Sequence, residues 1–403
     1  MIKVEYPFSQ INSSISKKQF NDIYYDLIKG KVDEVKINKL LDPLKVAKSE
    51  KLTLEKILIA DFHTLVEYST IIEKSKIKKD LVNCFQVARD KKNISVYENA
   101  QGAISEFFMV KGLNMKSCHY CNIDYINVFE ERYSYTSVED FIINAPREVL
   151  LKMPEISEDT ARSIRNVRTW NNVALQLRNL LGERVYKKIS SLLNGDISRN
   201  LKHFNYKNIT VLKNHFTLDH FLPKNDFQYF SLSLYNLVPS CNSCNCKFKG
   251  AMEFLPTAKL KALSPTSESY VLHKDLNFKL YFENTDGNVE RALNKVNILN
   301  DFTVEIENRN LLEGFDTYLN MFKLRGRYEF HRHDALKLIK KRKDYSDSQI
   351  KEISNFLIEN GIYKDEETIK VDLFGSIIFN DEEKNEPFAK YKRDIATQLG
   401  LIK

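Results

Sequence analysis

Hydrophobic side chains in residues 1–111 recur at three- and four-residue spacing, which is the pattern of helices with one buried face. The clearest runs are residues 20–28 and 53–59, and a third candidate extends over residues 97–111. No cluster of chemically active side chains accompanies these runs. We therefore expect residues 1–111 to form a helical N-terminal region that acts as a scaffold or contacts a partner.

The C-terminal region, residues 256–403, combines two kinds of pattern. Residues 278–282 and 302–306 alternate between apolar and polar positions as strands do, and Asp286-Gly287 marks a turn between them. Helical spacing returns afterwards, over residues 311–343 and 346–357. This region is expected to be a mixed α/β part of an α+β protein.

The central region, residues 112–255, contains a long insert at about residues 122–215, which we expect to be mostly helical. Residues 144–164 of this insert resemble a helix-hairpin-helix. In that family the hairpin is Gly-x-Gly, whereas this chain has Glu155-Ile156-Ser157. The side chains and the negative charge argue against the same contact with phosphate, and a plain helical insert is the alternative.

The composition narrows the class of protein. The 403 residues are 43% hydrophobic and 29% charged, as in ordinary soluble globular proteins. No apolar run has the length of a membrane span and no secretory signal opens the chain, so we expect a cytoplasmic protein with no membrane partner. Only 12 glycines are present, and because no Gly-rich nucleotide loop occurs, we expect no nucleotide cofactor. The net charge of +7 permits a polyanionic partner but is mild for a chain of this size.

The cysteines form two C-x-x-C pairs. Cys118 and Cys121 make the first pair, Cys241 and Cys244 make the second, and Cys246 follows directly. Paired cysteines of this spacing in a cytosolic chain indicate metal ligands before they indicate disulfides.

Chemically active side chains gather around the second cysteine pair. An alternating segment ends in Asp219 and His220, and Pro223 then ends the strand. Residues 232–235 predict a second strand that ends at Asn236, after which the cysteine pair opens a basic helix. Two short strands and a helix held by zinc would bring Asp, His and Asn together at one end.

This set of residue types suits metal-assisted hydrolysis of a phosphodiester. Carboxylate and amide oxygens can hold a hard cation such as Mg²⁺ or Mn²⁺. The pKa of an unperturbed histidine lets it accept a proton from water near neutral pH.

The segment resembles the core of the HNH endonucleases, also called His-Me finger or ββα-metal nucleases, in the subgroup with a four-cysteine zinc site. The resemblance implies that His220 is the general base and that Asp219 is a ligand of the catalytic metal. It implies that Asn236 braces the loop that carries the base, and that Asn245 is the second metal ligand, which makes the chain an HNN variant. It also implies a closed structural zinc site, whose ligands would be Cys118, Cys121, Cys241 and Cys244.

Two departures from the family pattern leave alternatives open. The gap after the first cysteine pair is unusually long, and Cys246 offers another zinc ligand. Lys247 and Lys249 are expected to project from the basic helix, either to contact a phosphate backbone or simply as solvated lysines.

A looser resemblance links residues 232–249 and 387–395 to bacterial HNH proteins of anti-phage defence systems, which are commonly encoded beside an ATPase. Taken together, the sequence predicts a metal-dependent endonuclease that hydrolyses nucleic acid, with DNA as the favoured substrate. It implies catalytic Mg²⁺ or Mn²⁺, structural Zn²⁺ and an ATPase partner encoded nearby. One alternative is a non-catalytic zinc module that binds nucleic acid or a partner protein. Another is a dormant nuclease that an ATPase partner or a signal bound elsewhere activates.

Overall fold

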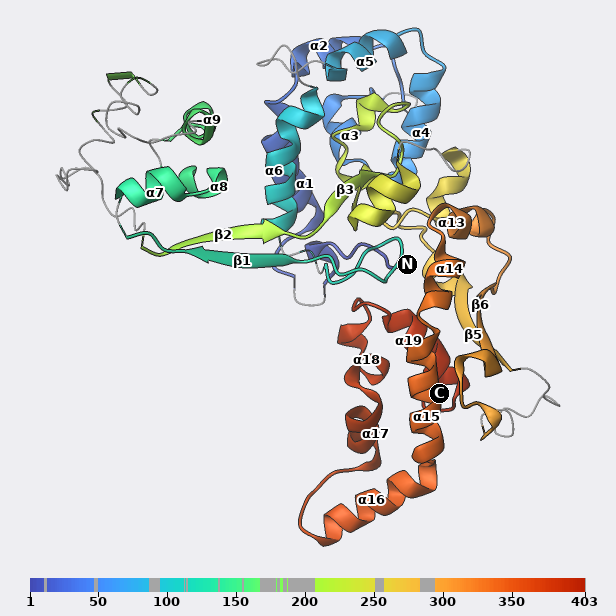
Figure 1. The fold of residues 1–403 in the computed structure, drawn as a ribbon. Coiled ribbons are helices and arrows are strands. Elements are labelled where there is room, and N and C mark those ends of the chain that lie inside the picture. The colour runs from blue at the N-terminus through green and yellow to red at the C-terminus, as the bar shows by residue number, and fades with distance from the viewer. Residues whose placement is uncertain are drawn as a thin grey trace. The chain divides into compact units, whose positions relative to one another are not determined.

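The chain forms two compact units in the computed structural model: Met1–Asn127 together with His215–Lys403, and Val128–Asn214. The described part of the chain is mixed α/β, with many helices and three two-stranded antiparallel sheets (Figure 1). The structure describes residues 1–10, 13–46, 50–86, 95–111, 113, 115–136, 138–153, 156–166, 179, 182–183, 187, 207–250, 257–282 and 294–402.

The N-terminal region is helical, as predicted. Three of its helices fall on the expected segments, and Ser16 and Ser95 begin two of these with a capping box that satisfies free backbone N–H groups. The helices are α1 (Lys17–Lys29), α2 (Glu34–Leu41), α3 (Leu54–Ile59), α4 (Phe62–Glu73), α5 (Lys78–Gln86) and α6 (Val96–Val110), preceded by the short helix η1 (Pro7–Ser9).

These helices hold the segment that connects the two strands of the candidate site. The Tyr24 hydroxyl of α1 donates to the carbonyl of Leu232 at 2.7 Å, and the Ser233 hydroxyl donates to the carbonyl of Ile57 in α3 at 2.6 Å. All four groups are buried, so each hydrogen bond satisfies a polar atom that water cannot reach. The N-terminal region is therefore a scaffold for this segment.

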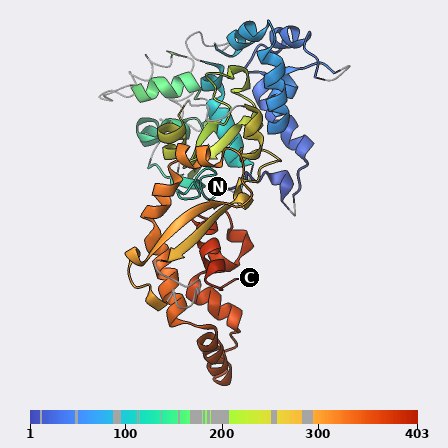
Figure 2. The same ribbon diagram turned by 90° about the vertical axis from the view of Figure 1, so that its right-hand side faces the viewer.

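The C-terminal region is built around the hairpin of β5 (Leu276–Phe282) and β6 (Phe302–Asn308), which confirms the two predicted strands. The predicted turn at Asp286-Gly287 lies outside the described residues. Helix α19 (Ala389–Gln398) lies along β5 (Figures 1 and 2). Its Asp394 accepts from the backbone N–H of Phe278 at 3.0 Å, and Gln398 exchanges two hydrogen bonds with the backbone of Leu280. The helix therefore satisfies backbone groups at the edge of the sheet.

The remaining elements in the described part of this region are mostly helical. They are η5 (Thr257–Ala262), α11 (Leu272–Asp275), η6 (Leu299–Asp301), α13 (Phe315–Met321), α14 (Leu324–Phe330), α15 (Arg332–Asp344), α16 (Asp347–Glu359), α17 (Glu366–Phe374), α18 (Ser376–Phe379) and η7 (Asp381–Glu383).

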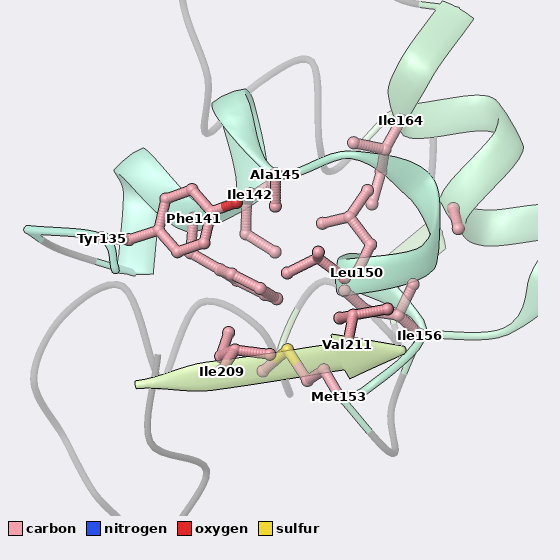
Figure 3. Packing of buried hydrophobic residues seen from close by; sticks show 12 residues of the cluster. Tyr135, Phe141, Ile142, Ala145, Leu150, Met153, Ile156, Ile164, Ile209 and Val211 are labelled. Carbon is pink, nitrogen blue, oxygen red and sulfur yellow. The ribbon is translucent and has the colours of Figure 1, made fainter. Parts of the chain in front are cut away.

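In its described residues, the second unit combines a hairpin with three helices around one apolar core (Figure 3). Its elements are β1 (Val128–Tyr133), α7 (Val138–Asn144), α8 (Arg147–Leu150), α9 (Glu158–Asn166) and β2 (Ile209–Asn214). Ile209 and Val211 alternate along β2 and enter the core beside Phe141 and Leu150 from the helices. The helices were expected, but the hairpin was not, because its strands lie far apart at opposite ends of the insert.

Among the described residues, no helix is both long enough and apolar enough to cross a bilayer.

The core of the second unit yields a stability prediction. Phe141 is fully buried, and its ring contacts the Tyr135 ring edge-on at 5.4 Å between centroids. Phe141→Ala should destabilise this unit by about 3–5 kcal/mol, because the truncated side chain leaves a cavity. Hydrogen exchange across residues 138–166 should accelerate, while zinc content stays that of the wild type. Unchanged exchange would contradict the core described here.

Candidate active site

The candidate site lies on a short antiparallel pair, β3 (Thr217–His220) and β4 (Leu237–Ser240), in which Asp219 faces Val238 and His220 faces Leu237. The predicted second strand is misplaced. Residues 234–236 form a short 3₁₀ turn, η3 (Leu234–Asn236), closed by the Asn236 N–H donating to the Ser233 carbonyl, and the strand begins only after it. The helical segment η4 (Ser243–Lys249) follows β4, so two strands and a helix occur in the expected order.

Asn236 joins the two ends of the loop between β3 and β4. Its side-chain oxygen accepts from the N–H of Leu222 at 2.7 Å. Its amide nitrogen donates to the carbonyls of Leu222 at 3.1 Å and Phe230 at 3.2 Å. The side chain is fully buried, so these bonds fix the loop that begins at His220.

The imidazole of His220 is held in one orientation. Its Nε2 lies 2.9 Å from the carbonyl oxygen of Ser231, and because a carbonyl can only accept, Nε2 carries the proton. The Tyr97 ring of α6 packs edge-on against the imidazole at 4.5 Å between centroids. In the neutral ring Nδ1 is then the basic nitrogen, and no described residue bonds to it.

Burial lowers the pKa of His220 to about 4, although the Ser231 carbonyl opposes the shift. The imidazole is therefore neutral at pH 7, which is the form that can accept a proton.

Asp219 is buried and both of its carboxylate oxygens are engaged. The Tyr120 hydroxyl donates to Oδ2, and the Lys249 amine donates to Oδ1 at 3.1 Å. Burial raises the pKa of Asp219 above its usual range, against the opposing effects of Lys249 and Tyr120. Tyr120 was missed in the sequence because its position between the two cysteines of the first pair gives no sign of a contact with Asp219, 99 positions away.

The residues expected to hold Mg²⁺ do not fit that ion in this arrangement. The side chain of Asp219 is 4% exposed and already bonds a cation, Lys249. Asn245 is half-buried in η4, and none of the contacts that the structure records joins its amide to Asp219. The donor types suit a hard cation, but the carboxylate is closed to one.

The two lysines of η4 differ. Lys247 is exposed, as a phosphate contact requires. Lys249 does not project as expected, because its side chain is 1% exposed and its amine bonds Asp219 and the carbonyl of His220. Contact with a phosphate backbone is thus open to Lys247 and closed to Lys249 in this structure.

The four cysteines of the two pairs form one buried group. The sulfur atoms of Cys118, Cys121, Cys241 and Cys244 all lie within 4.8 Å of one another, whereas Cys246 is exposed and outside the group. Four thiolates around Zn²⁺ at about 2.3 Å would stand a little under 4 Å apart, so the group fits a closed tetrahedral zinc site. The long insert therefore does not separate the two halves of the site.

Arg327 of α14 lies against this group and was not predicted to do so. Its guanidinium approaches the sulfurs of Cys244 at 3.3 Å and Cys121 at 3.5 Å, and it pairs with Asp124 at 3.0 Å. Four thiolates with one Zn²⁺ carry a net charge of about −2, which an arginine partly offsets. No local motif signals this contact, since Arg327 is 83 positions from Cys244.

No family model, curated protein or solved structure matches this chain.

The cysteine group predicts one tightly bound zinc per chain. Cys241→Ser should lose the zinc and unfold the surrounding region, because metal binding contributes directly to folding. Cys246→Ser is the matched control and should keep both zinc and fold, because its side chain is exposed. Elemental analysis and circular dichroism measure the two properties. Loss of zinc in the Cys246 variant would contradict the ligand set.

The burial of His220 predicts an unusual titration. Its ring should remain neutral as the pH falls from 7 to 5 and take up a proton only near pH 4. The unfolded chain binds this proton near pH 6.5, so the fold should lose stability as the pH falls from about 6.5 to 4. Ring-proton NMR, with the His220 signal assigned from His220→Ala, tests the pKa, and protonation near pH 6.5 would contradict it.

Proposed function

We propose that this chain is an HNH-type endonuclease that hydrolyses phosphodiester bonds in nucleic acid, with DNA as the substrate. The observation that carries the proposal is the placement of His220 at the end of β3, where the Ser231 carbonyl holds Nε2 and the Asn236 side chain braces the loop that follows. In this orientation Nδ1 is the ring nitrogen that can accept a proton, as a general base requires.

The geometry supports a single chemical role for each residue. His220 Nδ1 takes a proton from water, and the resulting hydroxide attacks phosphorus. The leaving oxygen departs with the electrons of the broken P–O bond and takes up a proton from solvent. The carbonyl of Ser231 stabilises the imidazolium by accepting from Nε2 at 2.9 Å. Asn236 keeps the loop that carries both groups in place through its three hydrogen bonds. The exposed Lys247 lies on η4, where it can bind a phosphate of the substrate.

The cysteine group would supply rigidity and no chemistry. Zinc bound by Cys118, Cys121, Cys241 and Cys244 has no open position for water, which is the mark of a structural site. The chemistry would then take place around His220 and not at the zinc.

One observation favours the alternative, a non-catalytic zinc module that binds nucleic acid or a partner protein. Asp219 is closed by Tyr120 and Lys249, and His220 is 8% exposed. A purely structural Asp-His pair would have the same burial. The two functions predict different results for His220→Ala: a nuclease loses cleavage, whereas a non-catalytic module keeps its binding of nucleic acid.

The decisive experiment is nicking of supercoiled plasmid by zinc-loaded protein, with Mg²⁺ or Mn²⁺ and without either. His220→Ala should abolish cleavage, a loss of at least about 10²-fold, because no other described side chain supplies the base. His215→Ala is the matched control, since His215 is exposed and five residues away, and it should cleave as the wild type does.

Melting temperature and zinc content must be the same in both histidine variants. Binding of plasmid without cleavage by the folded wild type, unchanged in His220→Ala, would favour the non-catalytic module. Unfolding of His220→Ala would assign the histidine to the core instead.

A further inference from the structure

In this structure the positive charge beside Asp219 is the side-chain ammonium of Lys249. The Lys249 amine lies 3.1 Å from Oδ1 of Asp219 and 2.7 Å from the carbonyl oxygen of His220. The lysine side chain is 1% exposed and the carboxylate side chain 4% exposed, so water cannot screen the pair. An ammonium placed so deeply persists only when acceptors surround it, and two are present.

The local backbone places Lys249 in this position. Helix η4 has π geometry, in which the N–H of Gly250 donates to the carbonyl of Asn245, five residues earlier, at 2.8 Å. Gly250 then turns the chain away with φ of 54° and ψ of −133°, a backbone conformation that residues other than glycine rarely adopt. Lys249 is therefore fixed as the last residue of a widened turn, and π turns of this kind are frequent at functional sites.

The pair leaves no room for a divalent ion on the same carboxylate. An ion bound to Oδ1 would lie no farther than about 5 Å from the ammonium, given the 3.1 Å contact and an ordinary metal–oxygen distance. The two positive charges would repel each other inside a buried site, where screening is weak. The other oxygen, Oδ2, is occupied by the Tyr120 hydroxyl.

We propose that Lys249 is the resident cation of this site and that its ammonium excludes divalent metal ions from Asp219. Asp219 then positions Lys249, and Lys249 in turn holds the backbone carbonyl of His220. This inference goes beyond the proposed function, because it concerns occupancy of the carboxylate and holds whether or not the chain cleaves nucleic acid.

The test measures Mn²⁺ binding to the full zinc-loaded chain, from the loss of the free-ion signal in electron paramagnetic resonance. The wild type should have no Mn²⁺ site that depends on Asp219, so Asp219→Asn should leave its Mn²⁺ binding unchanged. Lys249→Met and Lys249→Gln should each gain one Mn²⁺ per chain, at least about tenfold tighter than any site in the wild type, since the competing charge is gone. Adding Asp219→Asn to either variant should remove the new site.

Lys247→Met is the matched control. It removes the same charge two residues away, from an exposed side chain, and should gain no Mn²⁺ site. Lys249→Gln keeps a donor for the carbonyl of His220, so that loss of charge is separated from loss of the hydrogen bond. If either Lys249 variant is unfolded without metal, Mn²⁺ should restore its melting transition, because the ion then replaces the ammonium.

Two results would overturn the proposal. One is an Asp219-dependent Mn²⁺ site in the wild type, which would show that metal and lysine share the carboxylate. The other is absence of a new site, or of folding by Mn²⁺, in both Lys249 variants. Neither readout involves cleavage, so failure of the nuclease proposal leaves this test intact, and the reverse also holds.

Discussion

The convergence of four cysteine sulfurs is the constraint on which the rest of the first unit depends. Cys118 and Cys241 are 123 positions apart, and closing a loop of that order costs about 5 kcal/mol of chain entropy. Zinc bound by four thiolates contributes on the order of 10 kcal/mol, which exceeds that cost. Other parts of the chain also bond to the backbone around the first cysteine pair. The N–H of Ile2 donates to the carbonyl of His119, and the hydroxyl of Tyr328 donates to the carbonyl of Cys121.

Around this anchor, charged and polar groups are buried in a connected set. Tyr120 lies between two cysteines of the buried group and also bonds Asp219, which pairs with Lys249, which in turn bonds the backbone of His220. A partly satisfied buried network would be costly, and a satisfied one is rigid. The position of the imidazole is thus coupled to the cysteine group by three side chains, so loss of the metal would disturb His220 without touching it directly.

The sequence predicted what local patterns encode. Helical spacing located α1, α3 and α6, alternation located β5 and β6, and the paired C-x-x-C motifs identified the cysteine group. What it could not predict depends on contacts between distant residues. The inward direction of Lys249 follows from a π turn, and Arg327 reaches the sulfurs from α14. The strand beginning at Leu237 was placed too early, because the fit of Asn236 to its loop overrides the apolar pattern before it. The roles of His220, Asn236 and Asn245 remain predictions.

The insert of the second unit begins and ends at neighbouring points of the first. The N–H of His215 donates to the carbonyl of Asn127 at 2.8 Å, so the residues at which the chain enters and leaves the insert are joined by a backbone hydrogen bond. A path from Cys121 to Cys241 through that bond bypasses the insert entirely. The intervening segment is thus topologically equivalent to a tight turn. The insert could therefore differ in length without changing the distance between the two cysteine pairs in the folded chain.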